Sequence, residues 1–100
     1  MSFTVTPLST PTGLATTSTQ SYSVVLSWNA VSGAAQYHIY RNGAYVGSTT
    51  GTSFNVTGLN PSTSYSFTVQ AQDSGSNYSA QSSALNLTTA ASFEVFTPLP

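Results

Sequence analysis

Charge is the property that this sequence has least of. Only Arg41, Asp73 and Glu94 are charged at neutral pH, which is 3% of the 100 residues, whereas about 25% is usual for a globular domain. Lysine is absent. Binding to phosphate backbones draws on several Lys or Arg side chains, so a single arginine argues against nucleic acid as a partner. Serine, threonine, asparagine and glutamine supply the polarity instead, and they create no long-range field for steering charged ligands.

Cysteine is also absent, so the fold cannot rest on disulfides and no thiolate chemistry is available. No apolar run approaches the roughly 20 residues that a membrane span needs. The first eleven letters, MSFTVTPLSTP, contain neither a basic segment nor a continuous apolar segment, so we expect no signal peptide in this chain. A signal on a longer parent protein and export by another route, for example inside a virus particle, both stay open.

Groups able to carry catalysis are few. The carboxyls of Asp73 and Glu94 fall in a predicted turn and near the C-terminus, and nothing in their spacing brings them together for hydrolysis. His38 is the one histidine, and a metal site needs three or four ligands. No serine or threonine has a histidine base in a recognisable arrangement. We therefore expect a protein that is not an enzyme, with no catalytic residue, no metal and no cofactor.

The stretch from Leu59 to Ala71, LNPSTSYSFTVQA, organises the chain. Tyr65, Phe67 and Val69 alternate with polar residues, which is the period-2 pattern of a strand with one buried face. Asn60-Pro61-Ser62 precedes this strand and has the composition of a tight corner, because proline fixes its own φ and restricts the preceding residue. The Tyr65 hydroxyl is close enough in sequence to bond to the backbone of that corner.

The same alternation predicts further strands. They fall at 23–28, 36–41, 44–50, 52–57 and about 82–89, after a first strand that begins near Leu14. Asn42-Gly43 predicts a two-residue hairpin turn, because both central residues of a type I′ turn need a positive φ. Ala84, Leu85 and Leu87 are expected to help close the second sheet. Trp28 is the largest candidate for the core.

Two segments carry a resemblance to a known family. Leu59-x-Pro61-x-Thr63-x-Tyr65-x-Phe67-x-Val69-x-Ala71 resembles the E–F corner and F strand of a fibronectin type III domain. LSWNAVSGAAQYHIYRNG resembles the bacterial members of that family more than the animal ones. The resemblance covers residues 11–89 and implies an all-β, seven-stranded antiparallel immunoglobulin-like sandwich with a tyrosine corner. The core that we expect consists of Trp28, Tyr37, Ile39, Leu59, Tyr65, Phe67 and Val69.

Apolar arms are expected on both sides of this domain, at residues 1–10 and 90–100. Module linkers are usually polar, so these arms call for an explanation. In one interpretation they fold back and protect an edge of their own sandwich. In the other they cross to neighbouring subunits and add strands there. The candidate subunit contacts are Phe3, Val5, Phe93, Val95, Phe96 and Leu99.

Exposed aromatic residues are the remaining functional candidates. His38 and Tyr40, with Tyr45 across the predicted hairpin, form a candidate platform for stacking on sugar rings. Aromatic pairs on neighbouring strands also stabilise a sheet without binding anything, by about 0.2–1 kcal/mol each. Tyr22 and Tyr78 fall in predicted loops and are expected to be isolated. The three Asn-x-Ser/Thr sequons, at Asn55, Asn77 and Asn86, arise readily by chance in a sequence so rich in serine and threonine.

Two functional hypotheses follow. The first is a small virion assembly protein that decorates a bacteriophage capsid or tail and contacts other subunits, or copies of itself, through its arms. The second is an accessory or spacer module of a secreted bacterial carbohydrate-active enzyme or adhesin, with a polysaccharide as a partner. They place the chain on a virion surface or outside the cell, and neither involves nucleic acid or a membrane.

Overall fold

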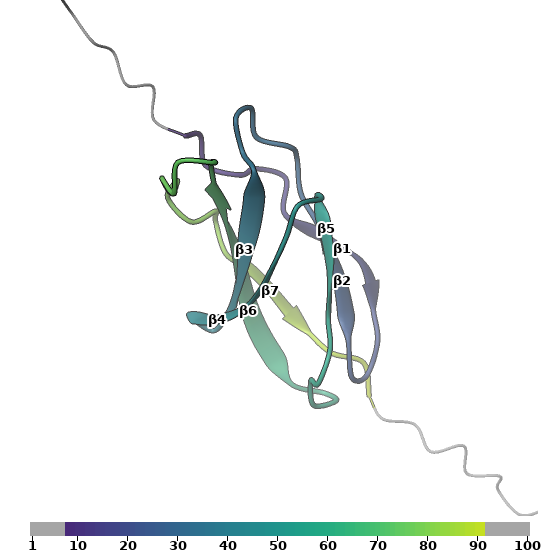
Figure 1. Ribbon diagram of the computed structural model, residues 1–100. Helices are drawn as coiled ribbons and strands as arrows, with labels where there is room; N and C mark the ends of the chain where they lie inside the picture. Colours follow the sequence, from purple (N-terminus) through teal and green to yellow (C-terminus); the bar gives the residue numbers. More distant parts are fainter. Residues whose placement is uncertain (1–7, 92–100) are drawn as a thin grey trace, which may run out of the picture.

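The computed structural model describes residues 8–91, which form two antiparallel β-sheets packed face to face (Figure 1). The smaller sheet has the order β1-β2-β5 and consists of β1 (Ala15–Thr19), β2 (Val24–Ser27) and β5 (Ser53–Val56). The larger sheet has the order β4-β3-β6-β7 and consists of β3 (Gln36–Arg41), β4 (Ala44–Thr49), β6 (Ser64–Gln72) and β7 (Leu85–Thr88). The predicted seven-stranded, all-β sandwich is confirmed. Residues 8–91 include no helix long and apolar enough to cross a membrane.

The core lies between the two sheets and follows the alternation of the strands. Val24, Leu26 and Val56 fill it from the smaller sheet, and side chains of β3 and β6 fill it from the larger one. The Trp28 ring packs edge-on against Tyr37, with 5.4 Å between the ring centroids. Tyr65 is half-buried and packs against the core. The other expected core residues are all buried: Trp28, Tyr37, Ile39, Leu59, Phe67 and Val69.

The corner before β6 is closed by a tyrosine, as the sequence predicts. The Tyr65 hydroxyl accepts a hydrogen bond of 2.9 Å from the backbone N–H of Asn60. This bond ties the start of β6 to the turn that feeds it. The guanidinium carbon of Arg41 lies 5.9 Å from the centre of the Tyr65 ring, so this cation stacks on the corner.

The hairpin between β3 and β4 also forms where the sequence places it. Asn42 has a φ of 51° and Gly43 a φ of 85°, the two positive values that a type I′ turn needs. The register between β3 and β4 shifts at a bulge next to this turn: Ile39 pairs with Gly47, whereas Tyr40 pairs with Tyr45. Because residues opposite one another on paired strands share a face, the bulge places these two tyrosines side by side on the sheet.

The described chain runs from one end of the sandwich to the other (Figure 1). Leu8 lies near Gly33, in the loop between β2 and β3. At the far end, Ala90 and Ala91 bond to Gln20 and Ser21 in the turn between β1 and β2. The candidate subunit contacts of the arms, Phe3, Val5, Phe93, Val95, Phe96 and Leu99, lie outside the described residues.

One detail of the last strand differs from the expectation. Ala84 is exposed and precedes β7, whereas Leu85 and Leu87 pack against the core opposite Phe67 and Tyr65. Since alternate residues point to opposite faces, a strand that turns Leu85 and Leu87 inward cannot also bury Ala84. The leucines alone close this edge of the larger sheet.

Candidate binding face

Aromatic side chains gather on the outer face of the larger sheet. His38 and Tyr40 point outward from β3 because they alternate with the buried Tyr37 and Ile39. The His38 and Tyr45 ring centroids lie 5.5 Å apart, and those of Tyr40 and Tyr45 lie 6.0 Å apart. The structure therefore brings together the three residues of the candidate platform.

Tyr78 joins this group, so the expectation that it is isolated is wrong. Its ring centroid lies 5.5 Å from that of His38. The reason is backbone pairing beyond β6: Tyr78 forms a bridge with Gln72, and the N–H of Ser79 donates to the carbonyl of Ala71. The segment after the turn thus runs back along β6, which places Tyr78 on the outer face of the larger sheet. We call His38, Tyr40, Tyr45 and Tyr78 the aromatic cluster.

A layer of glutamines supports the rings. Gln72 Oε1 accepts hydrogen bonds from His38 Nε2 at 2.7 Å and from Gln36 Nε2 at 2.6 Å, which places the imidazole proton on Nε2. The Tyr40 hydroxyl donates to Gln70 Oε1 at 2.9 Å. His38 and Tyr40 are therefore held in place, while Tyr45 and Tyr78 remain 57% and 53% exposed. The last two present the accessible surface of the cluster.

Asp73 holds the turn that carries Tyr78. Its carboxylate accepts hydrogen bonds from the backbone N–H of Asn77 and Gly75 and from the Asn77 side chain. The backbone bond from Asn77, followed by the side-chain bond from the same residue, lowers the pKa of Asp73 below its ordinary value of 3.8. The one aspartate of the sequence is thus committed to positioning a loop.

This geometry predicts a small loss of stability in acid. Because the pKa of Asp73 is lower in the folded than in the unfolded state, the stabilisation is complete above about pH 4 and is lost as the pH falls through the folded value. We expect Asp73→Asn to remove this part of the pH dependence below pH 4, as measured by urea unfolding from pH 2 to 5. If the variant lost as much stability below about pH 4 as the wild type does, Asp73 would not be the source of this pH dependence.

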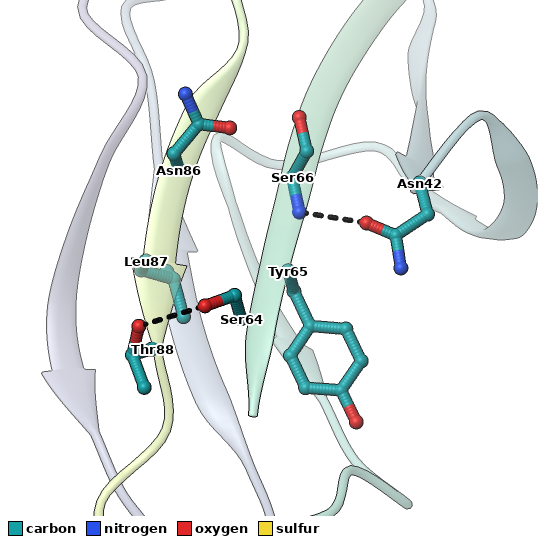
Figure 2. Close-up of a pocket in the computed structure, with 7 residues that line it drawn as sticks. All are labelled: Asn42, Ser64, Tyr65, Ser66, Asn86, Leu87 and Thr88. Carbon is teal, nitrogen blue, oxygen red and sulfur yellow. Dashed lines mark hydrogen bonds between the residues drawn. The ribbon is translucent and has the colours of Figure 1, made fainter. Parts of the chain in front are cut away.

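A shallow polar groove of about 390 Å³ lies on the same sheet, over β6 and β7 (Figure 2). Ser64 and Ser66 of β6 stand opposite Thr88 and Asn86 of β7. The hydroxyls of Ser64 and Thr88 are 3.1 Å apart. On the other side, Asn42 Oδ1 accepts a 2.9 Å hydrogen bond from the N–H of Ser66. What we call the polar groove is lined by Asn42, Ser64, Tyr65, Ser66, Asn86, Leu87 and Thr88.

Two charged side chains adjoin this face, one of each sign. Arg41 stacks on the Tyr65 ring and Asp73 is bonded within its turn. Within residues 8–91, no three His, Cys, Asp or Glu side chains come together where they could hold a metal ion. Rings, amides and hydroxyls therefore make up the chemistry of this surface.

Comparison with known proteins identifies the fold and the module. Residues 9–86 match the fibronectin type III domain family. The chain belongs to the fibronectin type III family. A chitinase, ChiA74 from Bacillus thuringiensis, contains a similar structure, with a TM-score of 0.77 and 31% identity over 84% of this chain and 14% of that one. This fibronectin type III domain is thus the non-catalytic module that the sequence predicts.

Curated relatives are long enzymes in which the domain is one part. A poly(3-hydroxybutyrate) depolymerase of Ralstonia pickettii is 51% identical over 85 residues, which are 85% of this chain and 17% of the relative. A chitinase of Paenibacillus xylanexedens is 50% identical over 86 residues, covering 83% of this chain and 16% of the relative. The chain thus spans about a sixth of these relatives. They favour the accessory-module hypothesis over the virion hypothesis, which the comparisons do not support.

Proposed function

We propose that this domain is a non-catalytic accessory module of a secreted enzyme that degrades an extracellular polymer. The observation that carries the proposal is the recurrence of a domain about 50% identical to this one in a polyester depolymerase and in a chitinase. These relatives act on chemically different polymers. A module shared between such enzymes serves a need that they have in common, namely work on an insoluble substrate outside the cell.

The path of the chain suits a spacer. The described residues begin beside the β2–β3 loop and end beside the β1–β2 turn, at opposite ends of the sandwich (Figure 1). Domains attached before and after it are therefore held apart by the length of the sandwich. Since the sequence has no cysteine, no disulfide supports the sandwich, and the apolar core between the sheets has to do so.

The aromatic cluster gives this spacer a surface that contacts the polymer. Tyr45 is more than half exposed on β4, and Tyr78 is more than half exposed where the chain forms a bridge with Gln72. Aromatic rings on such a scaffold supply large apolar contact area at little cost in conformational entropy. This surface is the part of the module that brings substrate close to the attached catalytic domain.

A domain exchange tests the proposal. The matched segment of the Paenibacillus xylanexedens chitinase is either deleted or replaced by residues 1–100 of this chain. We expect the replacement to restore activity on insoluble chitin several-fold relative to the deletion, because orientation and local concentration matter only on a solid substrate. Activity on a soluble chitooligosaccharide should be equal in the two proteins. Equal activity on insoluble chitin in both proteins would contradict the proposal.

A further inference from the structure

We propose that the aromatic cluster and the polar groove form one continuous track that binds a single neutral glycan chain lengthwise along β6. This inference rests on the proposed accessory function and deepens it, because it names the class of polymer and the direction in which it lies.

The two features follow one another along β6, with Thr68, whose hydroxyl donates to Gln81 Oε1, between them. In the register of β3 and β6, His38 pairs with Gln70 and Tyr40 pairs with Thr68. The next outward residue of β6 is Ser66, whose backbone is bonded to Asn42 in both directions, at 2.7 and 2.9 Å. From Gln72 to Ser64 the strand rises about 26 Å at roughly 3.3 Å per residue. The track therefore has room for several sugar units in succession.

The tilt of the rings indicates a single chain and not a crystal face. The interplanar angles are 46° for His38 and Tyr45, 54° for His38 and Tyr78, and 68° for Tyr40 and Tyr45. Aromatic rings that stack on a flat crystalline surface have to be coplanar with one another. Rings tilted against one another make a corrugated surface, which a free glycan chain can follow because successive sugars rotate about their linkages.

Hydrogen-bonding groups of the polar groove select for hydroxyls. Figure 2 shows Asn86 on β7 beside Ser66 of β6. No protein group within residues 8–91 bonds to the Ser66 hydroxyl or the Asn86 amide. Both side chains donate and accept, as sugar hydroxyls do, whereas a polyester offers acceptors only. With one cation, Arg41, and one anion, Asp73, beside it, the face has no excess of either sign, which matches a neutral chain.

Titration of the 100-residue chain with soluble oligosaccharides tests the track. Chitohexaose, cellohexaose and chitobiose serve as probes, with calorimetry as the readout. We expect at least one hexasaccharide to bind about tenfold more tightly than the disaccharide, because only the longer probe reaches both the aromatic cluster and the polar groove. Asn86→Ala and Ser66→Ala should each weaken hexasaccharide binding by about three- to tenfold, which corresponds to one lost hydrogen bond.

Asn55→Ala is the matched control, because Asn55 is also an exposed strand asparagine but lies on β5 of the other sheet. It should leave binding unchanged. Binding to crystalline chitin or to poly(3-hydroxybutyrate) granules without hexasaccharide binding would overturn the track and leave the accessory function standing. Equal affinity for both probe lengths, or groove variants that bind as the wild type does, would likewise overturn it.

Discussion

Trp28→Ala is expected to lower the free energy of unfolding by about 3–5 kcal/mol, the usual cost of removing a large buried aromatic ring. Trp28 is only 5% exposed, and its ring packs edge-on against Tyr37 between the two sheets. A domain of this size has a total stability of about 5–15 kcal/mol. The single substitution therefore removes a large share of it, and urea unfolding followed by circular dichroism measures the loss.

Trp28→Phe distinguishes the contribution of the apolar ring to stability from that of the buried indole N–H. The indole Nε1 is buried and has no hydrogen-bond partner among the described residues. Phenylalanine keeps most of the apolar contact and removes this unpaired donor, whose burial is unfavourable. We expect this variant to lose less than half as much stability as Trp28→Ala. If alanine cost less than about 1 kcal/mol, the central position of this ring in the core would be contradicted.

The Tyr45→Ala/Tyr78→Ala double variant is expected to show the largest effect on binding. These two side chains present most of the exposed aromatic surface of the cluster, and both contact His38. Truncating a central aromatic contact usually costs about tenfold or more in affinity, so the double variant should bind a hexasaccharide or amorphous chitin up to about 100-fold more weakly. Depletion assays on amorphous chitin provide the measurement.

Tyr22→Ala provides the matched control for exposed aromatic area. Tyr22 is 57% exposed, the same fraction as Tyr45, but it lies in the turn between β1 and β2. The control should bind as the wild type does, and the double variant should still unfold cooperatively. Equal weakening in Tyr22→Ala would show that binding follows general surface apolarity and not the aromatic cluster.

The core and the corner could be predicted because each depends on local pattern. Strict alternation decides which face of a strand is buried, so Tyr37, Ile39, Phe67 and Val69 fall inside without any knowledge of the loops. The bond between the Tyr65 hydroxyl and the N–H of Asn60 spans only five residues. Asn42-Gly43 similarly encodes its own turn through two positive φ values.

Tyr78 could not be predicted in the same way, because its position depends on how a loop folds. The Asp73 carboxylate closes the turn, and pairing of Ser79 with Ala71 then fixes the return path. One signal was available in the sequence: Asp-x-Gly-x-Asn between two polar segments is a turn that sends the chain back along its own strand. The polar groove could not be predicted, because Ser66 and Asn86 are ordinary surface residues in the sequence and come together only when β6 and β7 pair.

The core and the proposed binding surface lie on opposite faces of β6. On β6, Phe67 and Val69 fill the core, whereas Ser66 lines the polar groove and Gln70 supports the aromatic cluster. Substitutions of Ser66 or Gln70 should therefore cost less stability than those of Phe67 or Val69, whereas Tyr65 and Leu87 both pack against the core and line the polar groove. The subunit contacts proposed for the two arms stay a prediction, to be tested by light scattering of the chain with and without residues 1–8 and 90–100.

The most direct test of the binding face is nuclear magnetic resonance of the ¹⁵N-labelled chain titrated with chitohexaose and cellohexaose. We expect the largest amide shift changes at the outward-facing positions of β3, β4, β6 and β7, from Tyr78 and Tyr45 at one end to Ser66 and Asn86 at the other. Shifts concentrated on β1, β2 and β5, or no shifts at millimolar oligosaccharide, would contradict it.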